Sequence, residues 1–454
     1  MSTAGTAKAE GKFFKQIKEN FLREVVGPEA IAVPEWHLTK DGVAVEPSRM
    51  QKLTAYQMTQ RRTWGNWSGA GAGKTAAAGL AAYATDSQFT LVIATNSTLQ
   101  GWRKQLEEAF LGAQVVFSAE QAKRGRGTFL VLNYEKFQTL STELINKLVA
   151  LKPDMIVLDE VQLIKHRGGE EESLRRAALT SLLEKLGTSK VLCMSATPVI
   201  NDLSEGISLV EIAKGQKLEM NTMKTVNNAL AVHYELISSG LRYRPQYSLE
   251  MKTSVVTTTI TDWDTTNCTI LDFEQILLPH RLEAVKNKIQ PGTILYTEYV
   301  EGMVDVAVEF VRSLGLSVGR YTGEENTTER ELMHKEFIGG DIDVLVASRA
   351  IAVGVNGLQE RCNRMILLSL PWTFAAYEQV IGRIYRQGSK ADSVEIIIPQ
   401  VITTSHTTTY DTIRWDLIGS KRTLAECATD GIIPNMMAID RQKVLRQVQA
   451  ASKK

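Results

Sequence analysis

The sequence is poor in cysteine, has no long apolar run and carries almost no net charge. Its four cysteines lie far apart and form no CxxC pair, which argues against both a disulfide framework and a zinc site. Reduced thiols of this kind are typical of an intracellular protein. No apolar stretch is long enough to cross a bilayer and the first residues are polar, so we expect neither secretion nor membrane contact. Because the formal net charge is only +1, any nucleic acid would have to be held by a local surface.

What the sequence does contain is a glycine-rich pattern, SGAGAGKT, at residues 68–75. Glycines such as Gly71 and Gly73 let successive backbone N–H groups turn inward and let the chain approach an anion closely. In such a loop Lys74 reaches the β- and γ-phosphates of a bound polyphosphate and the hydroxyl of Thr75 ligates Mg²⁺, while the following helix adds its N-terminal dipole. The first position holds serine where the strict pattern has glycine. The alternative, a Gly/Ala-rich turn between core elements, is disfavoured because Gly-Lys-Thr runs directly into a helical segment.

After this loop, apolar β-rich runs alternate with helical ones. The expected strands are 89–95, 128–134, 155–160 and 190–197, with helices such as 98–110 and 171–186 between them. This alternation predicts βαβ units on a parallel sheet, whose ligands lie at the carboxyl ends of the strands.

Polar residues stand where these expected strands end. Asp159 and Glu160 follow four apolar residues, and we predict that Asp159 holds Mg²⁺ while Glu160 orients or deprotonates the attacking water. The alternative is a solvated acidic turn. Ser195 and Thr197 end another strand, and we predict that they couple the nucleotide state to a neighbouring domain. Upstream of the loop, Gln57 has an amide suited to reading the adenine edge, although alone it would be an ordinary surface residue.

The second half repeats the α/β alternation without a second phosphate loop. Strands are expected at 293–299, 317–321, 343–348, 365–370 and 394–398. A helical stretch there holds Gln379, Arg383 and Arg386, with the two arginines three residues apart. Guanidinium groups aimed at a nucleotide on another domain would act as arginine fingers. The alternative is a solvated basic helix face.

These motifs, in this order, resemble those of the superfamily-two helicases and translocases. Gln57 corresponds to the Q-motif, 68–75 to motif I, 159–162 to motif II, 195–197 to motif III and 379–386 to motif VI. The resemblance implies an α/β fold of two tandem RecA-like domains, each a parallel sheet flanked by helices. It also implies ATP hydrolysis with Mg²⁺.

Residues 348–356 indicate one branch of this superfamily, because they are similar to motif V of the Swi/Snf-type translocases. Within this motif, the resemblance implies that Gly354 contacts the nucleotide. Ile351 and Ala352 stand where that branch has paired glycines. Leu370-Pro371-Trp372 and Trp102 fit the same branch, although each tryptophan suits a core as well. With no room for large insertions, the chain resembles compact branch-migration and fork-remodelling helicases of tailed phages. The resemblance implies a cytoplasmic protein, in the host cytoplasm if phage-encoded, that acts on duplex or branched DNA.

A translocase of this kind grips the nucleic-acid backbone with hydroxyls and amides. The candidate contacts are Thr95, Asn96, Ser97, Asn133, Tyr134, Thr297, Ser348 and Asn356. Basic clusters at 123–126 and 165–167 are further candidates, with solvated loops as the alternative. Three rival functions stay open: an RNA helicase, an ATP-switched nucleic-acid sensor that does not unwind, and a small-molecule kinase, which the second-half arginines disfavour.

The expected division of the chain has five parts. They are an accessory segment (1–45), a first RecA-like domain (46–205), a connection with a small protrusion (206–290), a second RecA-like domain (291–430) and a helical tail (431–454). The accessory segment is expected to hold an amphipathic helix over 12–26 and a hairpin around Asp41. The Thr-rich stretch 253–266 suits either a hairpin or a loop. A helix over 407–421 is expected to fold back onto the second domain.

Overall fold

The computed structural model describes residues 26–40, 42–137, 142–164, 174–200, 202–245, 249–352, 355–386 and 388–433. Several expectations therefore lie outside the described residues. They concern nearly all of the 12–26 helix, the tail beyond 433, the basic cluster at 165–167, and Gly354.

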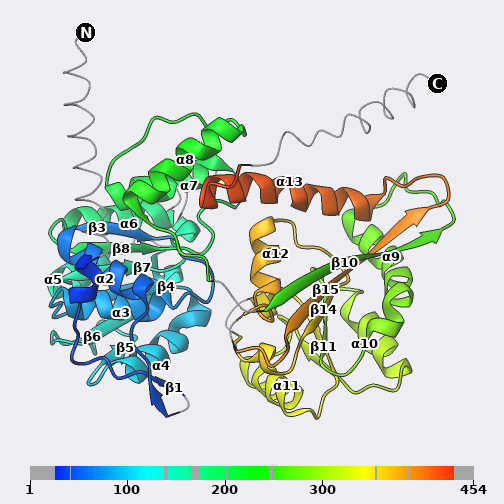
Figure 1. Ribbon diagram of the computed structural model, residues 1–454, viewed down its shortest axis with the longest axis horizontal. Coiled ribbons are helices and arrows are strands. Elements are labelled where there is room, and N and C mark those ends of the chain that lie inside the picture. The colour runs from blue at the N-terminus through cyan, green and yellow to red at the C-terminus, as the bar shows by residue number, and fades with distance from the viewer. Residues whose placement is uncertain are drawn as a thin grey trace, which may run out of the picture.

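The described chain forms two parallel sheets, each flanked by helices (Figure 1). The first has seven strands in the order β5-β6-β4-β7-β8-β3-β9, and the second has six in the order β10-β15-β14-β11-β13-β12. Every neighbouring pair in both sheets is parallel. We call the first sheet with its helices lobe 1 and the second lobe 2. The predicted fold of two tandem RecA-like domains is confirmed.

The elements of lobe 1 run from the short hairpin to β9. Its strands are β1 (Thr39–Lys40), β2 (Val43–Ala44), β3 (Thr63–Asn66), β4 (Thr90–Ala94), β5 (Gln114–Val116), β6 (Thr128–Asn133), β7 (Met155–Leu158), β8 (Lys190–Met194) and β9 (Gly240–Leu241). Its helices are α2 (Arg49–Gln60), α3 (Lys74–Ala84), α4 (Leu99–Ala109), α5 (Thr142–Leu151), α6 (Leu174–Lys185), α7 (Leu203–Lys214) and α8 (Val226–Ser239). The antiparallel pairing of β1 with β2 confirms the predicted hairpin.

Lobe 2 begins with a long edge strand. Its strands are β10 (Glu250–Ile260), β11 (Thr293–Tyr296), β12 (Val318–Tyr321), β13 (Val344–Ala347), β14 (Arg364–Leu367) and β15 (Ser393–Thr403). Its helices are α9 (Ile270–Val285), α10 (Val304–Ser313), α11 (Thr327–Gly339), α12 (Phe374–Ile381) and α13 (Tyr410–Asp430). The central strands β11 and β13 are buried along their whole length, as expected where helices cover both faces of a parallel sheet.

The segment 206–290 differs from the expected connection and protrusion. Helices α7 and α8 pack on lobe 1, and β9 pairs with β3 as its edge strand. The first part of the Thr-rich stretch is not a hairpin, since it lies in β10, one 11-residue strand paired in parallel with β15. Residues 261–266 lie outside any strand, as the loop alternative expected. Most residues of β10 are exposed, because the strand lies at the sheet edge, and this explains a polar, threonine-rich sequence. The domain boundaries themselves stay predictions.

Helix α13 is also longer than expected and contacts both lobes. Its 21 residues cross from lobe 2 to lobe 1 along one side of the molecule (Figure 1). Ile418 belongs to the core of lobe 2, whereas Cys427 and Ala428 belong to the core of lobe 1, where the helix packs on α8. It therefore joins the lobes and does not simply fold back onto the second. Among the described helices, none is both long and apolar enough to span a bilayer.

Candidate functional site

The glycine-rich loop lies between β3 and α3, at the carboxyl end of its strand. Gly71 and Gly73 have φ angles of 74° and 81°, in the left-handed region that favours glycine. The ammonium of Lys74 donates to the carbonyls of Ser68 (2.8 Å) and Gly69 (3.1 Å), so the loop curls around it. Burial lowers the pKa of Lys74, and the carboxylates of Glu160 and Asp159 act in the opposite direction.

The start of the loop is held by the chain that follows β9. The hydroxyl of Ser68 accepts from the N–H of Tyr243 (3.2 Å), and the N–H of Gly69 donates to the Tyr243 carbonyl (2.9 Å). The amide oxygen of Asn66 accepts from the N–H of Ser68 (3.1 Å). A glycine at position 68 would lack that hydroxyl acceptor, so the serine has a structural role here.

Gln51, rather than the predicted Gln57, contacts the loop. The Gln51 amide donates to the carbonyl of Gly73 (3.2 Å) and accepts from the N–H of Ser48 (2.7 Å), which caps α2. Gln57 lies six residues further along the helix, about 9 Å along its axis, and its amide oxygen accepts from Arg61 (2.9 Å). The adenine-reading role of Gln57 stays a prediction, and Gln51 is a second candidate that the structure adds. The Ser-x-x-Gln capping box was the available sequence signal.

The two carboxylates after β7 have different surroundings. Asp159 is 8% exposed, and its carboxylate accepts from the indole N–H of Trp102 (2.9 Å) and the N–H of Glu160 (3.0 Å). Burial and the adjacent Glu160 carboxylate raise the pKa of Asp159. Glu160 is half-buried, has φ of 50° and accepts from the amide of Gln162. A left-handed residue other than glycine is strained, and such strain clusters at functional sites.

Two aromatic residues support Asp159. Besides the indole of Trp102, the hydroxyl of Tyr134 donates to the Asp159 carbonyl (2.6 Å). Both side chains are buried, and their contacts bring α4 and the end of β6 to the end of β7. Sequence reasoning missed these contacts, because nothing local to either aromatic residue identifies an acceptor 25 or more positions away.

The arginines predicted as fingers lie after α12 in lobe 2. Arg383 donates to the carbonyls of Val355 (2.9 Å) and Ala352, and its buried Nε has no hydrogen-bond partner among the described residues. Burial and the neighbouring Arg386 lower the pKa of Arg383 to about 10, and Glu160 acts in the opposite direction. The interaction with Glu160 crosses from lobe 2 to lobe 1. Arg386 donates to the amide oxygen of Asn356 (2.8 Å).

The predicted coupling residues after β8 lie at the boundary between the lobes. The hydroxyl of Ser195 is buried and accepts from the N–H of Thr197 (3.1 Å). Thr197 lines a cavity together with Val199, Arg242 and residues of α12 and α13, and its hydroxyl oxygen has no partner among the described residues. Gln379 is half-buried on α12, the helix that leads to Arg383.

Of the predicted nucleic-acid contacts, one group forms an accessible cluster at the ends of β4 and β6. Asn96 and Ser97 are exposed, and Thr95 is half-exposed. The side-chain N–H of Asn133 donates to the amide oxygen of Asn96 (3.2 Å). In lobe 2, Asn356 is exposed.

Three other predicted contacts are buried, and for them the prediction is corrected. Tyr134 and Thr297 are 0% exposed and Ser348 is 3% exposed, so none can reach a nucleic-acid backbone in this arrangement. Thr297 instead donates to the carbonyl of Tyr299 (2.9 Å). These residues follow buried strands directly, where the chain still covers the sheet.

The basic cluster at 123–126 is bound to acidic groups of lobe 1. Arg124 pairs with Asp154 (2.9 Å), and Arg126 pairs with Glu35 (2.7 Å) and Asp86. This arrangement favours the structural alternative for the cluster over contact with a duplex.

Two protein-family models match the chain, one within lobe 1 and one within lobe 2. A model of the SNF2-related domain matches residues 36–241, which end with β9. A model of the helicase conserved C-terminal domain matches residues 274–388, which begin within α9. The chain belongs to the Swi/Snf-like branch of the superfamily-two helicases. This confirms the family that the motifs resembled.

Individual relatives of this helicase-family chain match it at low identity or over short stretches. The uncharacterized ATP-dependent helicase YqhH of Bacillus subtilis is 34% identical over 105 residues, 23% of this chain and 18% of that protein. The probable ATP-dependent DNA helicase RecS of Bacillus subtilis is 24% identical over 274 residues, 60% of this chain and 47% of that protein. The ATP-dependent RNA helicase p62 of Drosophila melanogaster is 31% identical over 105 residues, 23% of this chain and 14% of that protein. The chain thus spans less than half the length of each relative.

Proposed function

We propose that this chain is an ATP-dependent DNA helicase or translocase that acts on duplex or branched DNA without sequence specificity. The observation that carries the proposal is the division of the motif residues between the two lobes. The loop around Lys74 and the carboxylates Asp159 and Glu160 belong to lobe 1, and Arg383 and Arg386 follow α12 in lobe 2. A phosphate-binding half and an arginine half on separate lobes suit a machine in which ATP turnover depends on lobe arrangement.

The residues present fit ATP and Mg²⁺. In this proposal the backbone of Gly71 and Gly73 and the ammonium of Lys74 hold the phosphates, and Gln57, with Gln51 as the alternative, reads the adenine edge. The hydroxyl of Thr75 and a carboxylate oxygen of Asp159 would hold Mg²⁺, since hard oxygen ligands suit that ion. Bound there, the metal ion would neutralise charge that develops on the transferred phosphoryl group.

Each of the protein's own catalytic groups then has a separate role in ATP hydrolysis. Glu160 orients water and accepts its proton, because this carboxylate is half-buried beside the loop and within reach of the charge of Lys74. Arg383 and Arg386 stabilise the phosphoryl charge when the lobes close, and Gln379 helps to orient them. Ser195 and Thr197 lie where the nucleotide half meets α12 and α13, which suits a coupling role.

Two substitutions test the hydrolytic half of the proposal. Lys74→Ala removes the phosphate-binding ammonium and Glu160→Gln removes the proton acceptor, so nucleic-acid-stimulated ATP turnover should be lost in both. Phosphate release is measured with and without DNA, and circular dichroism checks that each variant is folded. Turnover at the unsubstituted level in either folded variant would contradict the assignment.

The nucleic-acid partner is tested by comparing ATPase stimulation by single-stranded DNA, duplex DNA, four-way junctions and RNA. Preference for duplex or branched DNA supports the proposal, and a preference for junctions would extend it to branch migration or fork remodelling. An RNA helicase is the second candidate, favoured by the similarity to the RNA helicase p62, and a response to RNA alone would establish it. Stimulation without strand separation or branch migration would instead support an ATP-switched sensor.

On the DNA side, we propose that Thr95, Asn96, Ser97 and Asn133 of lobe 1 and Asn356 of lobe 2 contact the phosphate backbone. Their amides and hydroxyls lie at the surface, which suits contacts without base recognition. Asn96→Ala should weaken binding about equally for unrelated DNA sequences, as measured by fluorescence anisotropy. A loss confined to one sequence would contradict backbone contact.

A further inference from the structure

The chain that leaves β9 carries two arginines at the boundary between the lobes. Arg242 and Arg244, which we call the linker arginines, flank Tyr243, the residue whose backbone holds the start of the phosphate loop. Arg242 is largely buried, with 13% of its side chain exposed, whereas Arg244 is 52% exposed. No motif considered above includes either residue.

Arg242 contacts three separate parts of the molecule with one guanidinium group. One nitrogen donates to the carbonyl of Trp67 (2.5 Å), next to the phosphate loop, and to that of Ala196 (3.0 Å), between the coupling residues. The other two donate to the carboxylate of Asp430, at 2.7 and 3.3 Å. The planar fork of arginine can satisfy all of these acceptors at once, which the single ammonium of lysine cannot.

Asp430 is the last residue of α13, and the other half of that helix is fixed to lobe 2. Near its start, Asp411 pairs with the buried Arg281 of α9, and further along the ammonium of Lys421 donates to the carbonyl of Trp372 (2.8 Å). The Arg242–Asp430 pair thus connects the edge of the phosphate loop to a rigid element of lobe 2. Arg244 adds weaker contacts to Asp430 (3.8 Å) and to Glu378 of α12 (3.9 Å).

We propose that Arg242 is a positioning residue that couples the phosphate loop to lobe 2 through its ion pair with Asp430. The proposal rests on the function proposed above and adds the link between the half-sites. With the pair intact, a change in the loop on ATP binding shifts the end of α13, and a lobe movement driven by DNA acts back on the loop. Without the pair, the contacts of α13 with α8 remain but the direct link to the phosphate loop is lost, so coupling between the lobes weakens.

The central test is Asp430→Asn, which keeps the shape of the side chain and removes its charge. Asp430 touches no proposed ATP or DNA contact, so unstimulated turnover and the KM for ATP should stay within about twofold. The ratio of DNA-stimulated to unstimulated turnover should fall at least about fivefold. Asp430→Glu keeps the carboxylate and should recover most of the ratio. Asp416→Asn, the same change at an exposed position of α13, is the matched control and should alter nothing.

Arg242→Lys separates the two halves of the arginine's role. Lysine keeps the charge but loses the fork, so the KM for ATP should rise as the contacts to Trp67 and Ala196 weaken, together with a lower stimulation ratio. A merely structural role would lower the melting temperature of Asp430→Asn and reduce both turnover rates in parallel. That parallel loss, or a wild-type stimulation ratio in Asp430→Asn, would overturn the proposal.

A second measurement keeps this test distinct from the test of function. Fluorescence energy transfer between dyes on Cys268 of lobe 2 and on a cysteine introduced by Lys104→Cys in lobe 1 reports the distance between the lobes. A non-hydrolysable ATP analogue with Mg²⁺ should change the transfer efficiency in the otherwise unsubstituted protein and change it much less with Asp430→Asn. If DNA fails to stimulate the unsubstituted protein, the proposed function fails, and the dye measurement alone decides whether the pair couples the lobes. An equal change in both proteins would contradict the coupling.

Discussion

At the residue scale, the site depends on side chains whose roles come from their neighbours. Ser68 departs from the strict phosphate-loop pattern, and its hydroxyl accepts a hydrogen bond from the chain that leaves lobe 1. Gln51 caps its own helix and also contacts Gly73. An alanine at position 73 would be strained by its left-handed backbone and would place its Cβ 2.8 Å from the Gln51 amide. The position of the Gln51 side chain therefore requires glycine at position 73.

The choice between the two glutamines is open to a direct test. Gln51→Ala removes the contact with Gly73 and one side of the proposed adenine site, so the KM for ATP should rise about tenfold with a smaller change in kcat. Gln57→Ala loses only a side-chain contact with Arg61 and should leave the KM within about twofold. Steady-state ATPase assays with DNA present measure both. The reverse order of effects would support the assignment of Gln57.

A second residue-scale prediction concerns Trp102. Trp102→Phe removes the indole donor to Asp159, and losing a hydrogen bond to a buried carboxylate costs about 1–3 kcal/mol. The Mg²⁺ concentration that gives half-maximal ATP turnover should therefore rise about tenfold. Trp64→Phe is the control, because that tryptophan is also buried but its indole N–H has no partner among the described residues. A similar shift in both variants would point to packing rather than to the carboxylate.

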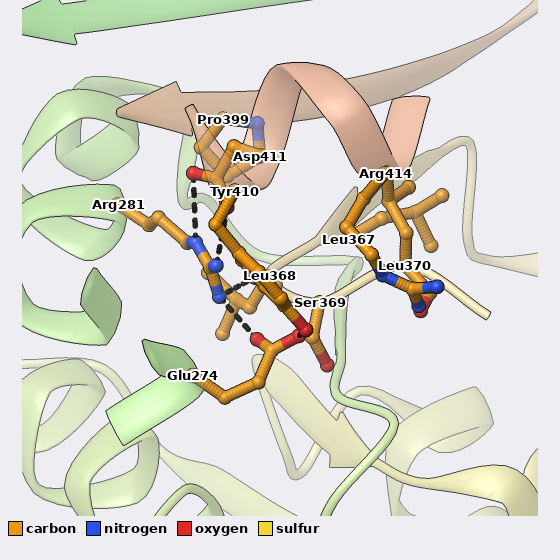
Figure 2. A pocket seen from close by; sticks show the side chains of 10 residues that line it. All are labelled: Glu274, Arg281, Leu367, Leu368, Ser369, Leu370, Pro399, Tyr410, Asp411 and Arg414. Atoms are coloured by element: carbon orange, nitrogen blue, oxygen red, sulfur yellow. Dashed lines mark hydrogen bonds and ion pairs between the residues drawn. The ribbon is translucent and has the colours of Figure 1, made fainter. Parts of the chain in front are cut away.

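At the scale of elements, lobe 2 is held together by a buried charge cluster between α9 and α13 (Figure 2). Arg281, 2% exposed, donates to the carboxylates of Asp411 and Glu274 and to the carbonyl of Leu368 (2.8 Å). Figure 2 shows the hydroxyl of Tyr410 pointing to Glu274, at 2.9 Å. The cluster fixes the start of α13, which makes this helix a stiff connection from lobe 2 to lobe 1.

Removing the arginine should destabilise lobe 2 strongly. Arg281→Ala leaves two buried carboxylates without their shared cation, and breaking such a pair costs about 3–5 kcal/mol. Lys104→Ala, which removes an exposed ion pair with Glu108 on α4, should change the free energy of unfolding by less than about 0.5 kcal/mol. Urea denaturation followed by fluorescence measures both. Equal, small losses would show that the cluster is not a stability determinant.

At the scale of the whole molecule, the proposed active site is divided between lobes that have separate cores. The phosphate loop and the carboxylates come from lobe 1, and the arginines after α12 come from lobe 2. Since each lobe supplies what the other lacks, hydrolysis should need both, whereas nucleotide binding should need mainly the first.

This division predicts a split between binding and turnover. Arg383→Ala should lower DNA-stimulated kcat at least about a hundredfold while changing the Kd for ATP less than about threefold, because arginine fingers act on the transition state. Lys74→Ala should instead weaken ATP binding itself. Isothermal titration with a non-hydrolysable analogue gives the Kd, and phosphate release gives kcat. Loss of ATP binding in Arg383→Ala would mean that lobe 2 stabilises the bound ATP itself as well as the transition state.

The sequence by itself determined the fold class and the positions of the motifs along the chain. Loops such as 68–75 and strand ends such as Asp159 are defined by residues adjacent in the chain, so local spacing reveals them. The alternation of apolar strands and helices likewise predicted two parallel sheets. Local patterns also placed the core strands β4, β6, β7 and β8 within a few residues of their observed bounds.

Only the tertiary structure decided which residues meet across long separations. It placed Gln51 rather than Gln57 at the loop, brought Trp102 to Asp159, and buried Tyr134, Thr297 and Ser348. It also made residues 253–260 of the Thr-rich stretch part of an edge strand, where exposure to solvent permits the polar side chains that the sequence alone presents as loop or hairpin. Such outcomes depend on packing between elements distant in the chain, about which periodicity and spacing within one segment carry no information.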